Sequence, residues 1–172
     1  MTDRRKRIAV DTCVVLDFLV PVDESRAERA KRVLDGHGER YELVLPAIVI
    51  PEVAGAPPLR ESNLSKADRE RRVATAMAWI RQSNFIVAEL SDRTSRRAAQ
   101  LAVTHQLKGP DASILATAEQ WGCVHLFTRD KGLISCNSDE FGFVISEPDD
   151  VPLAEEPELN LFTIGPNEKP PA

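Results

Sequence analysis

Short apolar runs alternate along this chain with segments whose apolar residues recur at helical spacing. The short runs predict strands over residues 8–10, 41–45, 85–90, 125–127 and 141–145. Between them, apolar residues three and four positions apart predict helices over residues 14–19, 26–34, 46–54, 65–82, 91–105 and 111–121. This alternation favours an α/β fold with a mainly parallel central sheet and helices on both faces.

The composition changes after Ser146. Residues 147–172 contain six of the twelve prolines and carry seven acids and one lysine, a net charge of −6. We therefore expect a folded domain over residues 1–146 and an extended or disordered acidic tail over residues 147–172. The whole chain has a net charge of −5, so the first 146 residues are close to neutral. Such a body does not exclude a nucleic-acid partner.

The cysteines and the hydropathy indicate where the protein works. Cys13, Cys123 and Cys136 lack metal-ligand spacing and are typical of reduced thiols in a cytoplasmic protein, and Cys13 and Cys123 fit small core positions. No apolar run approaches the roughly 20 residues of a membrane span, so we expect no membrane partner. The basic N-terminus precedes a stretch broken by Asp11 and Asp17, without a small-residue cleavage site, which argues against a signal peptide.

Four carboxylates interrupt apolar segments. Asp11 directly follows the first predicted strand, and Asp130 follows the strand HLF after two residues. Asp111 lies in the first turn of its helix, and Glu52 lies within the apolar segment VLPAIVIPEVAG. The carboxyl ends of parallel strands meet at one edge of a sheet, so the topology can bring these acids together there.

Clustered carboxylates repel one another, and a cation would relieve that repulsion. Mg²⁺ and Mn²⁺ prefer oxygen ligands, whereas the absence of a Cys/His cluster disfavours zinc. A metal at such a site can activate water and stabilise charge on a phosphodiester.

Each acid also has a simpler explanation when it is taken alone. Asp11 could cap the following turn, Asp111 could favour its helix N-terminus, and Asp130 could serve a turn. Glu52 could lie on an exposed helix edge. The occurrence of all four in these positions favours a common site.

The segments AVDTCVVLDFL, LPAIVIPEVAG and GPDASILATAEQWGCVHLFTRDKGL together resemble a PIN domain, and especially the VapC-type toxin ribonucleases of bacterial toxin–antitoxin pairs. The last segment is the most specific, with a Thr-x-Asp whose acid lies nineteen residues after the first Asp. The resemblance covers roughly residues 7–146. It implies a three-layer α/β/α fold and a metal-dependent endoribonuclease that uses Mg²⁺ or Mn²⁺.

Motif matching then assigns roles to single residues. The implied catalytic and metal-binding quartet is Asp11, Glu52, Asp111 and Asp130. Thr12 and Thr128 match hydroxyl residues that hydrogen-bond these acids or bound water. The resemblance further implies cleavage of RNA to a 5′-phosphate and a 3′-hydroxyl, a homodimer, and an antitoxin peptide that covers the acidic edge.

Basic residues offer candidate RNA contacts. Arg129 and Lys131 flank Asp130 and could contact the RNA backbone. The arginines of the 91–105 helix are better explained as a solvated face.

Other functions remain open at this stage. The chain could be a PIN-fold nuclease of RNA processing, or a catalytically silent PIN scaffold or RNA-binding module. A strand ending in Asp-Thr also occurs in haloacid-dehalogenase phosphatases, but their second acid would stand at Cys13. Receiver domains need an acid at the end of the 41–45 strand, and none is present.

Overall fold

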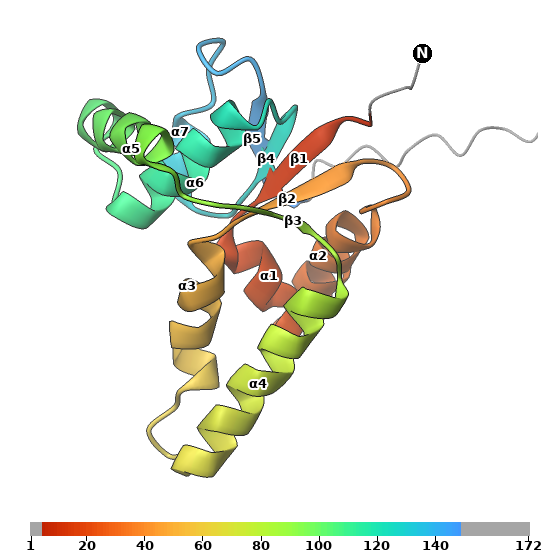
Figure 1. The fold of residues 1–172 in the computed structure, drawn as a ribbon. Helices are drawn as coiled ribbons and strands as arrows, with labels where there is room; N and C mark the ends of the chain where they lie inside the picture. Colours follow the sequence, from red (N-terminus) through yellow and green to blue (C-terminus); the bar gives the residue numbers. More distant parts are fainter. Residues whose placement is uncertain (1–4, 149–172) are drawn as a thin grey trace, which may run out of the picture.

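A five-stranded, wholly parallel sheet forms the centre of the molecule. The computed structural model describes residues 5–148 of the chain, and its strand order is β3-β2-β1-β4-β5 (Figure 1). The strands are β1 (Arg7–Val10), β2 (Glu42–Pro46), β3 (Ile86–Ala88), β4 (His125–Phe127) and β5 (Val144–Ser146). The predicted α/β fold with a parallel sheet is confirmed.

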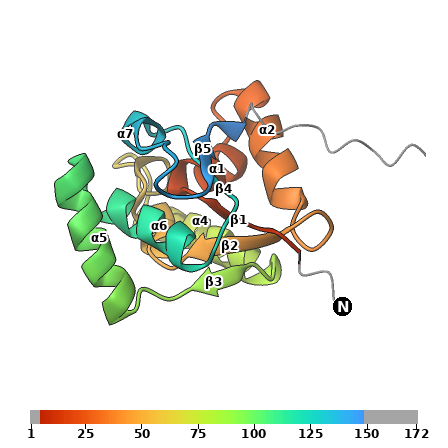
Figure 2. The same cartoon turned by 90° about the horizontal axis from the view of Figure 1, so that it is seen from above.

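Helices cover both faces of this sheet and produce three layers. They are α1 (Thr12–Leu19), α2 (Glu24–Asp35), α3 (Val49–Gly55), α4 (Lys66–Gln82), α5 (Asp92–His105), α6 (Gly109–Gln120) and α7 (Lys131–Ser135), with a short 3₁₀ turn at Pro57–Leu59. Figure 1 shows α5 and α6 on one side of the sheet and α1, α2 and α4 on the other, and Figure 2 shows the same layers from above.

The central strand β1 delivers a carboxylate to the edge of the sheet. Its apolar residues Ile8, Ala9 and Val10 are buried between β2 and β4. The backbone N–H of Asp11 still donates to the carbonyl of Phe127, at 3.0 Å, so the ladder extends one residue beyond the strand. Asp11 therefore lies at the carboxyl end of the sheet, where open parallel sheets bind ligands.

Helix α6 is the most deeply buried helix of the described part of the chain. Its residues 112–118 are all buried, because small side chains such as Ala112 and Ala116 let it lie between the sheet and α5. A helix that is buried all round needs apolar or small residues on every face. Its two ends are more exposed, and Asp111 in the amino-terminal turn is half-exposed.

Several element boundaries differ from the sequence prediction. Pro46 ends β2 instead of opening a helix, and α3 begins at Val49. The chain at Pro46 stays beside β3, and the N–H of Ala47 donates to the carbonyl of Ala88 at 2.9 Å. The strands β3 and β5 are also shorter than expected, and α7 was not predicted, because five residues are too few to show helical periodicity.

Two further expectations concern membrane spans and the C-terminal tail. Among residues 5–148, no helix is long and apolar enough to cross a membrane. The proposed acidic tail over residues 147–172 lies outside the described residues, apart from Glu147 and Pro148.

Candidate functional site

Asp11 is a buried carboxylate whose hydrogen bonds come from three donors. It is 6% exposed and caps the N-terminus of α1. Its Oδ1 accepts the N–H of Thr12 at 2.5 Å, and its Oδ2 accepts the hydroxyl of Thr128 at 2.6 Å and the thiol of Cys13 at 3.2 Å. These donors offset part of the cost of burying a carboxylate.

Burial nevertheless dominates the electrostatics of Asp11. It raises the pKa of the Asp11 carboxyl above its usual value, although the hydrogen bonds from Thr128, Cys13 and Thr12 act in the opposite direction. The negative charge of Asp130 raises this pKa further. The charged form of Asp11 would thus gain from a nearby cation.

Thr12 connects the first acid to the second. Its backbone N–H donates to Asp11, and its hydroxyl donates to Oε2 of Glu52 at 2.5 Å. Glu52 is half-buried and belongs to the first turn of α3. Thr12 therefore ties the start of α1 to α3 and fixes the orientation of the Glu52 carboxylate.

Thr128 connects Asp11 to Asp130 in the same manner. Its hydroxyl donates to Asp11 and accepts the backbone N–H of Asp130 at 2.9 Å. Asp130 caps α7 by accepting the N–H of Leu133 at 3.0 Å. A β-carbon at Gly132 would lie 2.9 Å from Oδ1 of Asp130, so a residue without a side chain leaves room for this carboxylate.

Asp111 completes the cluster from the opposite layer. Its pKa is raised to about 6, first by burial and then by the negative charges of Asp130, Asp11 and Glu52, whereas Lys108 lowers it. The four predicted acids therefore lie close enough at one edge of the sheet to influence one another. Asp11 and Asp130 cap α1 and α7, whereas Glu52 and Asp111 lie in the first turns of α3 and α6.

The donor set fits a hard divalent cation. Carboxylate oxygens are the ligands that Mg²⁺ and Mn²⁺ prefer, and four carboxylates lie near this edge of the sheet. As the side chains lie, no three acidic, histidine or cysteine residues within residues 5–148 converge closely enough to hold an ion. The side chains of Asp11, Glu52 and Asp130 are instead held by the two threonines and by backbone N–H groups.

Cys13 takes part in this site, which the sequence did not reveal. Besides its bond to Asp11, its sulfur accepts the backbone N–H of Arg129 at 3.2 Å. It is half-buried and packs against the core, so the prediction of a small core residue was incomplete. The signal was its place in the first turn of α1, two residues after Asp11. Burial and the charge of Asp11 raise its thiol pKa, so it stays protonated.

The two flanking basic residues lie in different environments. Lys131 is exposed at the start of α7. The Arg129 side chain is only 13% exposed, and its guanidinium pairs with Asp17 at 2.5 Å and with Glu147 at 3.3 Å. Arg129 therefore joins α1 to the segment that follows β5, and an RNA contact would require it to exchange these partners.

The arginines of α5 form ion pairs on the protein itself. Arg96 pairs with Asp92 at 2.9 Å, and Arg97 binds Glu119 through two hydrogen bonds. The exposed Arg96 agrees with the predicted solvated face, whereas Arg97 is half-buried and joins α5 to α6.

We predict that Thr128→Val weakens Mn²⁺ binding by about 10- to 100-fold, the usual effect of removing a group that orients a metal ligand. The change removes the donor to Asp11 and the acceptor of the Asp130 N–H. Calorimetric Mn²⁺ titration measures it, with the exposed Thr104→Val as the matched control. Equal affinities for both variants and the wild type would contradict the orienting role.

We predict that Arg129→Met lowers the free energy of unfolding by about 3 kcal/mol at pH 7, because it leaves a mostly buried carboxylate at Asp17 without its cation. Asp17 keeps only 20% of its side chain exposed. Urea unfolding measures the change. The double variant Asp17→Leu/Arg129→Met should recover most of the stability, and no recovery would contradict this explanation.

Comparison with known proteins identifies the family of this chain and shows structures with a similar fold. The family model of the PIN domain matches residues 8–136. None of the curated proteins matches the sequence. Two solved structures are similar in fold. FitAcB from Neisseria gonorrhoeae has a TM-score of 0.62 and 22% identity, over 84% of this chain and 99% of that one. VapC20 from Mycobacterium tuberculosis, described as a Sarcin-Ricin loop cleaving toxin, has a TM-score of 0.57 and 20% identity, over 72% and 89%.

A third similar structure contains two kinds of protein. It is a toxin–antitoxin complex from Klebsiella pneumoniae, with a TM-score of 0.57 and 22% identity, over 82% of this chain and 97% of that one. These likenesses concern the arrangement of helices and strands, and the chemistry must come from the site.

Proposed function

Because the chain belongs to the PIN-domain family, we propose that it is a metal-dependent endoribonuclease that hydrolyses RNA phosphodiester bonds. The observation that carries the proposal is the raised pKa of the Asp111 carboxyl. Its pKa is raised to about 6 by burial and by three further carboxylates. A protein that places four acids at one sheet edge bears a repulsion that a bound cation would relieve.

In this proposal the residues of the site have distinct tasks. Asp11, Glu52, Asp111 and Asp130 would hold Mg²⁺ or Mn²⁺, directly or through water. The ion supplies an activated water and stabilises charge on the phosphoryl oxygens. Thr12 and Thr128 hold the acids in place.

Binding of the RNA backbone is assigned to the exposed basic side chain next to Asp130. Lys131 is exposed and could reach a phosphate, whereas Arg129 would serve only after release from Asp17 and Glu147. Hydrolysis would leave a 5′-phosphate and a 3′-hydroxyl.

We further propose that the protein is the toxin of a toxin–antitoxin pair and acts in the cytoplasm as a homodimer. Support comes from the similar structures, of which one is described as a Sarcin-Ricin loop cleaving toxin and another as a toxin–antitoxin complex. The antitoxin would bind over the acidic edge.

A catalytically silent PIN scaffold is the main alternative. Such a protein has no reason to keep carboxylates at all four positions, nor two threonines that orient them. A nuclease of RNA processing would share the chemistry and differ only in its partner and substrate.

The test is cleavage of mixed structured RNA by the purified protein in Mn²⁺, in Mg²⁺ and in EDTA, with the cut ends mapped. We expect discrete cuts that EDTA abolishes and that carry a 5′-phosphate. Cleavage that persists in EDTA would contradict metal dependence. Absence of both cleavage and Mn²⁺ binding would favour the scaffold.

A further inference from the structure

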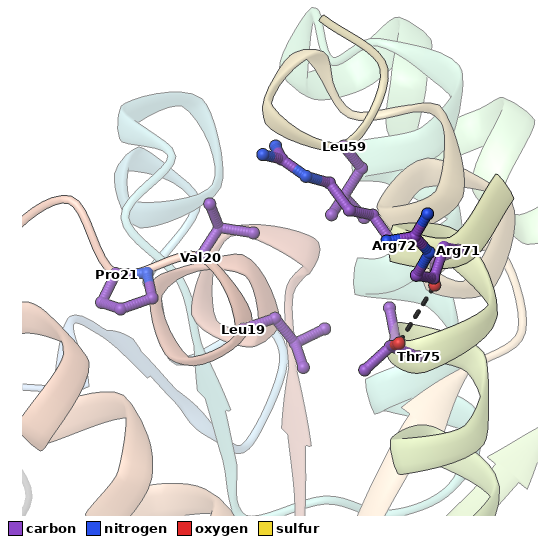
Figure 3. Close-up of a pocket in the computed structure, with 8 residues that line it drawn as sticks. Leu19, Val20, Pro21, Leu59, Arg71, Arg72 and Thr75 are labelled. Carbon is purple, nitrogen blue, oxygen red and sulfur yellow. Dashed lines mark hydrogen bonds between the residues drawn. The ribbon is translucent and has the colours of Figure 1, made fainter. Parts of the chain in front are cut away.

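A groove with an apolar floor lies between α1 and α4, away from the four acids. Its volume is about 390 Å³, within the range of about 300–1,000 Å³ common for binding pockets. Figure 3 shows the end of α1 on one side and the 3₁₀ turn with α4 on the other. The lining residues are Leu19, Val20, Pro21, Leu59, Arg71, Arg72, Thr75 and Ala76.

The α4 side of this groove carries positive charge. The charge of Arg71 is partly neutralised, because its guanidinium pairs with the half-exposed Asp68 at 3.1 Å. The Arg72 guanidinium donates to the carbonyl oxygen of Pro58 at 3.0 Å and shares the negative charge of Asp68 with Arg71, so two arginines face one acid. An occupant of the groove should therefore combine apolar side chains with acidic ones.

The described part of the chain ends at Pro148, and Arg129 ties the neighbouring Glu147 to α1, the helix that forms one side of this groove. Glu147 and Asp17 bind the same guanidinium of Arg129. Asp17 lies two residues before Leu19, which lines the groove. The 24 residues after Pro148 could span about 80 Å if fully extended, so the groove is well within their reach.

The sequence of those residues matches the groove in chemistry. Residues 149–172 carry six acids and one lysine, and residues 158–164 read ELNLFTI, in which four apolar side chains follow Glu158. A short apolar segment with acids upstream suits an apolar floor beside arginines.

We propose that the C-terminal segment of this chain docks in the groove between α1 and α4 of the same chain. Leu161 and Phe162 cover the apolar floor, and the acids before them face Arg71 and Arg72. The proposal does not depend on the nuclease function, because none of the four acids lines the groove.

The test uses the full-length protein with a nitroxide spin label on Asn167→Cys. Burial raises the thiol pKa of Cys13, Cys123 and Cys136, so they react slowly, and the parent protein without the new cysteine measures any background labelling. We expect the label to broaden the methyl NMR signals of Leu19, Val20 and Leu59, and chemical reduction of the label should restore them.

Two sets of variants check what holds the segment. Arg71→Glu with Arg72→Glu should abolish the broadening, and so should Leu161→Ser with Phe162→Ser, which leaves every described residue unchanged. Arg93→Glu, an exposed arginine of α5, is the matched charge control and should have no effect.

The same methyl signals can also contradict the proposal. Groove methyls that stay sharp in the labelled protein would overturn it. Equal broadening of the groove methyls of unlabelled, isotope-enriched chains after addition of labelled, unenriched chains would also overturn it, because the occupant would then be the segment of a second copy.

Discussion

Asp11→Asn should lower the rate of metal-dependent RNA cleavage by more than about 100-fold. Loss of a group that only orients a metal ligand costs about 10- to 100-fold. Asp11 is proposed as a direct ligand, so its loss should cost more. The substitution preserves the shape of the side chain but removes a charge from the cluster. An asparagine oxygen can still accept the N–H of Thr12, and its amide group can donate to the hydroxyl oxygen of Thr128. The loss should therefore reflect metal chemistry and not misfolding.

The measurement is initial cleavage rate at saturating Mn²⁺, paired with urea unfolding of the same samples. Asp92→Asn is the matched control, since it makes the same chemical change at an exposed acid in the first turn of α5. The control should cut at the wild-type rate. Equal rates for wild type and Asp11→Asn would mean that the cleavage comes from a contaminant or from residues outside the cluster.

Asp111→Asn separates function from stability, because the two should change in opposite directions. We expect cleavage to fall by about 100-fold or more, as for another direct ligand. The metal-free protein should become more stable at pH 7.5. The shift in pKa from 3.8 to about 6 would be worth about 3 kcal/mol for a shielded group. Asp111 is half-exposed, and solvent screening reduces the expected gain to about 1 kcal/mol.

The sign follows from proton linkage. Since the folded state raises the pKa of Asp111, folded protein binds this proton more tightly than unfolded protein. The charged group destabilises the fold fully above about pH 6, and the penalty disappears as the pH falls from about 6 to below 3.8. The stability gain of Asp111→Asn should accordingly shrink between pH 7.5 and pH 4.

Urea unfolding at both pH values, in EDTA, measures this gain. Added Mn²⁺ should stabilise the wild type more than the variant. An ion that binds the folded state raises its stability according to its affinity, and the variant lacks one of the proposed ligands. A variant that is less stable than the wild type at pH 7.5 would contradict the repulsive cluster. The attraction of a carboxylate to the amino end of α6 would then outweigh the repulsion.

The sequence was most informative where patterns are local. Apolar spacing located every strand and every helix of three turns or more. Ser65 and Ser91, a residue type favoured at helix N-termini, cap α4 and α5. It failed at short elements, such as α7, and at Pro46, whose place in β2 depends on the neighbouring strand β3. Intrinsic preferences are weak over a few residues, so tertiary contacts decide such segments.

The candidate site divides in the same way. By itself the sequence determined which residue types stand at the ends of the apolar segments, and so the four acids and the two threonines could be named. Only the tertiary structure decided how they act on one another: that Thr12 binds Glu52, that Thr128 joins Asp11 to Asp130, and that Cys13 belongs to the site. It also turned Arg129 inward to Asp17 and Glu147. The physical reason is distance along the chain. Hydrogen bonds act over about 3 Å and charge repulsion over about 10 Å. Residues more than a hundred positions apart reach that range only when the parallel strands align.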